Sequence, residues 1–248
     1  MTPEMAECIA SAYQAFQADT PSSLEVCRHC CMEPEIEDTF FDHPIHQLPL
    51  AYVRDWFFAA SDSPTVSVQL SRYLLPRVME LLAQEQEVAM VGTEVSLTRF
   101  ATGDTDRWSA AENAVIMNFV RLYLERFRPS KTKTLPEDAV DDVLCMLSSA
   151  GHDMNEFLEH LWNWSDEDLF ALLARDWDGG YGRPSIWSTA FWEPNDWNHP
   201  KHSDNAGKVA KWYRSGEMGA RAKQALQQPG QTSELTRNAG MVLAAIEA

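Results

Sequence analysis

"WSAAENAVIMNFVRLYLERF", residues 108–127, is the stretch of sequence that decides the fold. Ser109 and Glu112 have the S-x-x-E spacing of a capping box, in which each side chain binds the other residue's backbone N–H. Apolar side chains then recur every three or four residues, which is the period of one face of an α-helix. These side chains belong to Ile116, Phe119, Val120, Tyr123 and Phe127. The stretch therefore predicts a long amphipathic helix.

The same period recurs on both sides of this stretch, and no alternating strand pattern is longer than residues 93–100. Proline removes a backbone donor and crowds the preceding turn, so Pro76 is expected to kink the helix of residues 66–84 or to break it into two arms. Pro3 suits the first turn of the first helix, and Gly151 is expected to stop the helix before it. The expected helices occupy residues 3–16, 50–61, 66–84, 108–127, 137–151, 152–164, 165–177, 216–226 and 233–248.

These elements predict an all-α fold, an irregular multi-helix single domain over residues 1–248. The basic linker "RPSKTKTLP", residues 128–136, divides it into possible lobes 1–128 and 136–248. A length of 248 residues suits one large domain or two small ones.

A long segment, residues 178–204, is rich in Gly, Pro, Asn and Trp and interrupts the helical pattern. We expect one short helical turn in it, at residues 185–192. Trp187, Trp192 and Trp197 lie in this segment, and tryptophan is enriched at the energetic centres of protein interfaces. The alternative is that these rings cover a core between short helices.

The formal net charge is −17. Residues 1–100 hold 15 acidic and 5 basic residues (−10), residues 101–200 hold 18 and 8 (−10), and residues 201–248 hold 4 and 7 (+3). A field of this sign repels nucleic acid and anionic membranes, and it favours solubility and fast encounter with basic partners. The charge therefore predicts a basic protein partner, with no nucleic acid and no membrane.

The segment "CRHCCMEPEIEDTFFDHPIH", residues 27–46, concentrates cysteine and histidine. Cys27 and Cys30 have C-x-x-C spacing, and His43 and His46 follow, so the set contains the donors of tetrahedral zinc. A structural zinc site on these four residues, or on a variant set with His29 or Cys31, is one interpretation. The other is that the cysteines are small buried apolar residues, with Cys27 and Cys31 sharing a helix face with Leu24.

No paired nucleophile and base or known catalytic motif is visible, so the sequence favours a protein that is not an enzyme and needs no cofactor beyond the possible zinc. The N-terminus lacks the basic region of a signal peptide, and no apolar run approaches the roughly 20 residues of a membrane span. Five cysteines, two of them adjacent, do not resemble a secreted disulfide framework. A cytoplasmic location is the expectation.

Three motifs occur in order: "CRHCC" with Cys27 and Cys30, "RYLLPRVMELLA" with Pro76, and "DRWSAAENAVIMNFVRLYLERF" with Trp108 and Glu112. In this order they resemble a group of uncharacterised bacterial helical proteins, over about residues 20–130. The resemblance implies a shared helical scaffold and no activity. In character the chain is also similar to the acidic immunity proteins that neutralise toxins, and this is an analogy.

The function expected from the sequence is therefore that of an immunity protein or inhibitor that binds and blocks a basic toxin, such as a nuclease. A metal-dependent enzyme that uses the Cys/His cluster or the loop from His199 to His202 is the alternative. A structural adaptor without an inhibitory role is a third interpretation. The residues expected to bind the partner are Glu33, Glu35, Glu37, Asp38, Asp138, Asp141, Asp142, Trp187, Trp192 and Trp197.

Overall fold

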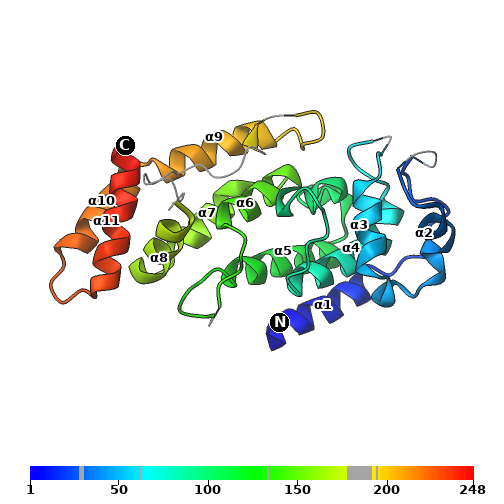
Figure 1. Ribbon diagram of the computed structural model, residues 1–248, viewed down its shortest axis with the longest axis horizontal. Helices are drawn as coiled ribbons and strands as arrows, with labels where there is room; N and C mark the ends of the chain where they lie inside the picture. Colours follow the sequence, from blue (N-terminus) through cyan, green and yellow to red (C-terminus); the bar gives the residue numbers. More distant parts are fainter. Residues whose placement is uncertain (28–30, 62, 133, 178–191, 194) are drawn as a thin grey trace.

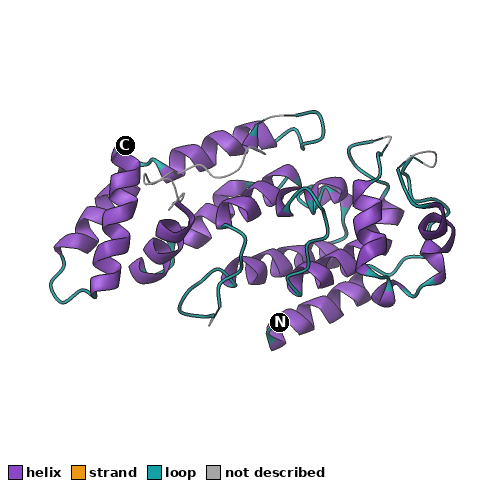
Figure 2. Cartoon of the chain, viewed as in Figure 1, coloured by secondary structure: helices purple, strands orange, loops and turns teal. Residues whose placement is uncertain are grey.

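The computed structural model describes residues 1–27, 31–61, 63–132, 134–177, 192–193 and 195–248. Within these ranges the regular structure is helical, and the one β-type contact is an isolated bridge between Val26 and Ser61. Figure 2 shows helices joined by loops. The prediction of an all-α, multi-helix fold is confirmed.

The described α-helices form an elongated array, with α2 and α3 near one end and α10 and α11 at the other (Figure 1). Short 3₁₀ turns lie between them, including η3 (Thr93–Val95) and η4 (Thr98–Phe100). The α-helices are α1 (Pro3–Ala15), α2 (Pro34–Thr39), α3 (Leu50–Phe58), α4 (Val68–Ala83), α5 (Ala110–Glu125), α6 (Val140–Ser149), α7 (Met154–Trp162), α8 (Asp166–Trp177), α9 (His202–Tyr213), α10 (Gly216–Gln227) and α11 (Ser233–Glu247).

Helix α5 begins at the predicted capping box. The Ser109 N–H donates to Glu112 Oε2 at 2.7 Å, and the Glu112 N–H donates to Ser109 Oγ at 3.3 Å. The Glu112 carboxylate also accepts two hydrogen bonds from Arg72 of α4, with Nε–Oε1 at 2.5 Å and Nη2–Oε2 at 3.0 Å. The cap therefore ties α5 to α4, and the predicted apolar stripe from Ile116 to Phe127 is buried.

Helix α4 runs without a break from Val68 to Ala83, with Pro76 inside it. The expected division into two arms is wrong. Proline leaves the carbonyl of Arg72 without its helical donor, but the segment is buried along most of its length, including Leu74, Leu75 and Pro76 itself. Packing of this apolar surface outweighs the cost of about 3 kcal/mol for a helix-interior proline.

Helix α9 was not expected, because the segment "HSDNAGKVAKWY" carries few apolar side chains. It packs against α6 and α7. Its buried face includes polar groups that find partners far away in the sequence: His202 Nδ1 lies 2.8 Å from Ser148 Oγ, and Asn205 Nδ2 donates to the carbonyl of His152 at 2.8 Å. These tertiary contacts, rather than apolar periodicity, hold the helix in place.

The apolar core is connected from α1 to α11. It contains Leu70 of α4 and Phe127 on one side of the linker at residues 128–136, and Leu144 of α6 on the other, so both predicted lobes contribute to one cluster. At one end of the molecule α10 packs against α11, and α11 packs against α8. None of the helices in the described ranges combines the length and apolarity needed to cross a membrane.

Gly151 ends α6 as predicted, with a φ of +89° that other residues rarely adopt. The next residue, His152, is only 4% exposed, and its Nε2 lies 2.9 Å from Thr102 Oγ1. Burial lowers the pKa of His152 to about 4, and the nearby positive charge of Lys201 acts in the same direction. The His152 ring is therefore neutral in the folded protein at neutral pH.

We expect acid to destabilise the protein through His152. An unfolded histidine binds a proton below pH about 6.5, while the folded ring stays neutral down to about 4. Unfolding therefore takes up a proton in this window, and the free energy of unfolding should fall by about 2 kcal/mol between pH 6.5 and pH 5. Thermal unfolding followed by circular dichroism at both values measures the loss. His152→Gln should reduce the dependence of the free energy of unfolding on pH in this range. An unchanged dependence in the variant would contradict the assignment of the effect to His152.

Candidate functional site

A group of acidic side chains lines a cavity of about 660 Å³. Its wall comes from the end of α4 and the following segment, from η3, from the end of α5, from residues 134–138 and from the start of α6. Among the described residues, one basic side chain, that of Arg126, lines it. The carboxylates in the wall belong to Glu85, Glu87, Glu94, Glu137, Asp138 and Asp142. Six carboxylates and one guanidinium among the described lining residues give this cavity a negative electrostatic environment.

The first wall is built where α4 ends. Glu85 N–H donates to the Leu82 carbonyl at 3.0 Å and Gln86 N–H donates to the Leu81 carbonyl at 3.0 Å, the bond pattern of a Schellman motif. This motif places Glu85 in the left-handed region, with φ of +61°. Glycine is the usual residue there, since a side chain costs roughly 1 kcal/mol in this conformation. The chain carries that strain and thereby places a carboxylate at the cavity.

Arg126 lines the cavity, and its guanidinium is bonded to other groups of the wall. Its Nη1 donates to the Leu82 carbonyl at 3.0 Å, and its Nη2 lies 2.8 Å from Glu85 Oε1. The guanidinium carbon also lies 4.7 Å from the centre of the Tyr123 ring. Burial raises the pKa of Tyr123 to about 12, so this ring stays neutral. The guanidinium of Arg126 is therefore already ion-paired within the wall.

The opposite wall holds two of the residues predicted to bind a partner, Asp138 and Asp142. Thr93 Oγ1 donates to Asp138 Oδ2 at 3.1 Å, and Arg175 Nη2 donates to the Asp138 carbonyl at 3.1 Å. Asp142 Oδ2 accepts the N–H of Ala139 at 2.9 Å, which caps α6. In the described part of the chain, no ion pair involves Glu137, Asp138 or Asp142.

Ionisation of the Asp142 carboxyl group is unfavourable in the folded protein. Burial is the main cause that raises its pKa to about 6, and the charges of Glu94, Asp141 and Asp138 add to it. A positive group placed in the cavity would offset both the lost hydration and the repulsion. The electrostatics of the cavity therefore favour an arginine or lysine side chain and disfavour a phosphate.

A tight turn forms the cavity's rim. Gly92 N–H donates to the Ala89 carbonyl at 3.1 Å, and Gly92 has a φ of +127°. A Cβ at Gly92 would lie 2.2 Å from Glu94 Oε2, so only glycine admits the carboxylate at this place. Glycine here therefore positions Glu94 in the wall.

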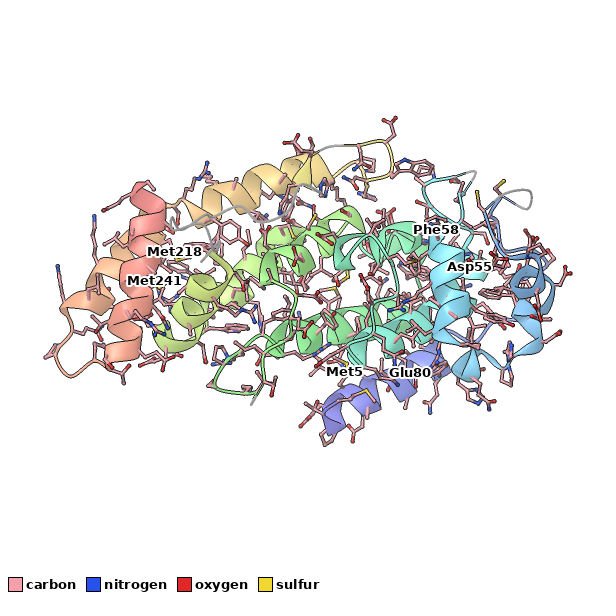
Figure 3. All side chains as sticks on the ribbon, in the orientation of Figure 1. Met5, Asp55, Phe58, Glu80, Met218 and Met241 are labelled. Atoms are coloured by element: carbon pink, nitrogen blue, oxygen red, sulfur yellow. The ribbon has the colours of Figure 1, made fainter. Side chains whose placement is uncertain are left out.

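The second predicted acidic group lies on α2 and does not line the cavity. Glu33, Glu35 and Asp38 are exposed, and Glu37 is half-buried. The Glu33 N–H donates to Asp55 Oδ2 of α3 at 3.0 Å, which fixes α2 beside α3 (Figure 3). The sequence therefore predicts two acidic groups, and the structure places them on different elements.

Asp141 and Trp192 are corrections to the predicted partner-binding set. Asp141 is 2% exposed and Trp192 is 3% exposed. Asp141 accepts the Tyr213 hydroxyl at 2.8 Å and the Trp192 indole N–H at 3.0 Å, and the Trp192 ring stacks on His202. Both residues hold α6 and α9 together and offer no contact surface.

Of the other predicted tryptophans, Trp197 is 56% exposed and open to a partner. Trp187 and most of the expected helical turn at residues 185–192 lie outside the described residues.

The zinc hypothesis for Cys27, Cys30, His43 and His46 stays a prediction, because Cys30 lies outside the described residues. The expectation that Cys27 and Cys31 share a helix face is wrong: both are half-buried and lie outside the helices. Within the described ranges, no three Cys, His, Asp or Glu side chains gather as a metal site. Elemental analysis of the purified protein, with a melting curve in chelator, separates bound zinc from plain thiols.

His199 and His202 turn to different partners and form no shared clamp. His199 Nε2 lies 3.0 Å from Asp104 Oδ1 at the surface, while His202 is 1% exposed against Ser148.

Sequence reasoning missed Glu85, Glu87, Glu94 and Arg126. Each sits near an element boundary, and the run of acids after α4 was the available signal. Comparison of the chain with family models, with curated proteins and with solved structures finds no match. The resemblance to uncharacterised helical proteins therefore stays a prediction.

Proposed function

We propose that this protein binds a basic protein partner through the acidic cavity and blocks it, as an immunity protein blocks a toxin such as a nuclease. The observation that supports the proposal is the set of six carboxylates that line one cavity, against one guanidinium among the described lining residues, which is paired with Glu85. The formal charge of −17 adds a long-range field of the same sign. Fields of this kind speed the encounter with a basic partner and fix its orientation.

Magnitudes favour the cavity over the exposed acids of α2 as the binding site. An exposed ion pair contributes about 0–1 kcal/mol, because water and salt screen it. Charge pairs that lose water at an interface couple by about 1.5–7 kcal/mol. Asp142 is half-buried and burial is the main cause of its raised pKa, so a partner's guanidinium would meet a carboxylate that gains from the encounter.

The test uses two variants that remove the same charge from the two acidic groups. Asp138→Asn/Asp142→Asn changes the cavity, and Glu35→Gln/Asp38→Asn changes α2. Each is co-expressed with the product of the neighbouring gene, and growth rescue and co-purification are scored. We expect the wild type and the α2 variant to rescue growth and retain a basic partner, and the cavity variant to retain at least about tenfold less.

Salt provides the second readout, since the association rate of the wild type should fall steeply as ionic strength rises. Capture of no basic protein would contradict the proposal. Equal losses in the two variants would show that net charge alone acts, and a loss confined to the α2 variant would move the site to α2.

A further inference from the structure

The turn at the rim of the cavity presents two apolar side chains to solvent. Gly92 N–H closes the turn on the Ala89 carbonyl, so Met90 and Val91 occupy its two central positions. They are 67% and 61% exposed, and Val91 lines the acidic cavity. Central turn positions usually hold Gly, Pro, Asn, Asp or Ser, because these residues supply the backbone angles or the local hydrogen bonds. The backbone requirements of the turn therefore do not explain why Met90 and Val91 occupy its central positions.

The turn is anchored by packed residues on both sides. Val88 and Ala89, which lead into it, are 0% and 2% exposed. Gly92 closes it with the Glu94 carboxylate folded against its backbone. A surface that is ordered before binding loses less entropy when the partner arrives. The backbone that carries Met90 and Val91 is thus anchored on both sides of the turn.

A third exposed apolar side chain belongs to the neighbouring helix. Arg54 of α3 donates from Nε to the Glu87 carbonyl at 2.7 Å, which ties α3 to the segment before the turn. Phe58, labelled in Figure 3, lies one helical turn after Arg54 and is 68% exposed. Six large apolar side chains are exposed in the described residues, and two of them are adjacent at this turn.

We propose that the turn Ala89–Gly92 and the cavity beside it dock a basic segment of the partner in which an arginine or lysine adjoins a large apolar side chain. This inference rests on the proposed function and names the partner's contact chemistry. The charge of the wall selects the occupant: in the described part of the chain no ion pair involves Glu137, Asp138 or Asp142, and an apolar ligand alone would bring them no counter-charge. Methionine suits such a surface, because its side chain adapts to different apolar shapes. The carboxylates would speed association with the partner, and the apolar side chains of the turn would slow its dissociation.

Three fluorescein-labelled hexapeptides serve as probes: alternating Arg-Leu, alternating Arg-Ser and alternating Glu-Leu. Fluorescence anisotropy at low salt measures their affinity for the wild type, for Met90→Ser/Val91→Ser and for Leu226→Ser. Leu226, 36% exposed on α10, is the matched control for loss of an exposed apolar side chain. Because all three positions are exposed, the melting temperatures should stay unchanged.

We expect the wild type to bind the Arg-Leu peptide about tenfold more tightly than the Arg-Ser peptide, and to bind the Glu-Leu peptide least. Met90→Ser/Val91→Ser should bring the two arginine peptides within about twofold of each other, while Leu226→Ser should keep the preference. Equal affinity of the wild type for both arginine peptides would overturn the inference, as would a preference that survives in Met90→Ser/Val91→Ser, or tight binding of Glu-Leu.

Other outcomes of the same peptide measurements would contradict the proposed function itself. If neither arginine peptide binds, or if Asp138→Asn/Asp142→Asn binds Arg-Ser as well as the wild type does, the cavity is not a cation site. If arginine binding depends on the cavity but leucine adds nothing, the proposed function stands and only the docking role of the turn is lost.

Discussion

Asp168→Ala is expected to lower the free energy of unfolding by about 3–5 kcal/mol, the cost of breaking a buried charge pair by removing one partner. The Asp168 side chain is 3% exposed and accepts hydrogen bonds from Arg128 Nε at 2.8 Å, from the Ser130 N–H at 2.7 Å and from Ser130 Oγ at 2.7 Å. It thereby fixes the segment after α5 to the first turn of α8. Ser165 Oγ also donates to Asp168 Oδ2, at 3.2 Å. Alanine would leave all of these donors without this acceptor.

Urea unfolding followed by tryptophan fluorescence measures the loss, which corresponds to roughly 6–20 °C in melting temperature for a chain of this size. Asp168→Asn keeps one acceptor oxygen but turns an amide toward Arg128, so a smaller loss of roughly 2–3 kcal/mol is expected. Glu167→Ala is the matched control: it removes an exposed acid from the same helical turn and should cost at most about 1 kcal/mol.

The pH dependence of the Asp168 effect has a definite sign. Its hydrogen bonds to Arg128 and Ser130 outweigh burial and hold the pKa of Asp168 below its ordinary value. A carboxylate with a depressed folded pKa stabilises the fold above its unfolded pKa of about 3.9 and loses this effect as pH falls through the folded value. The gap between wild type and Asp168→Ala should therefore be full at pH 7 and should narrow below about pH 4. A small, pH-independent difference would show that the network does not hold the two segments together.

Local signals predicted α5 because its cap and its apolar stripe lie within the helix itself. The capping box of Ser109 and Glu112 formed as expected. The same reasoning could not place α9, because the groups that satisfy His202 and Asn205 lie about 50 residues earlier, in Ser148 and His152. It also gave Pro76 too much weight, since the burial of α4 around that residue is decided by the rest of the fold.

The cavity shows the same limit at the level of single residues. Asp141 and Asp142 are adjacent and both were expected to meet a partner, yet one is enclosed by Tyr213 and Trp192 while the other lines the cavity. Adjacent residues of a helix point in directions about 100° apart. The orientation in which α6 packs therefore decides which of the two carboxylates faces the cavity. Asp138 meets the segment that carries Glu85, Glu87 and Glu94 through its bond to Thr93, a contact across 45 residues of sequence. The acidic composition predicted a basic partner, but tertiary packing decides which acids line the cavity.

Asp142→Asn is expected to stabilise the isolated protein at neutral pH while weakening its complex. The folded pKa of Asp142 is about 6, against 3.8 as its ordinary value. A carboxyl group whose pKa is raised on folding favours the fold below its unfolded pKa and loses this contribution as pH rises through the folded value. The difference corresponds to about 3 kcal/mol, which we reduce to about 1–2 kcal/mol because the side chain is partly exposed to solvent.

The opposing terms for Asp142→Asn are smaller. Asparagine can still accept the Ala139 N–H, so the cap of α6 is kept. Loss of the favourable charge–dipole interaction at the start of α6 costs about 0.3–1 kcal/mol. We therefore expect a higher melting temperature for Asp142→Asn than for the wild type at pH 7 and no gain at pH 4, where Asp142 is protonated in the folded protein. Glu137→Gln, an equal charge change at an exposed position of the same wall, should leave stability unchanged.

The binding side of the same experiment carries the functional argument. If a basic partner fills the cavity, its positive group relieves the cost of ionising Asp142, so the wild type gains more from the complex than the variant does. Asp142→Asn should therefore bind the Arg-Ser hexapeptide at least about tenfold more weakly while melting at a higher temperature. Gains in stability at the expense of function are typical of residues kept for binding. A variant that is less stable at every pH, with unchanged peptide affinity, would make Asp142 a helix cap and nothing more.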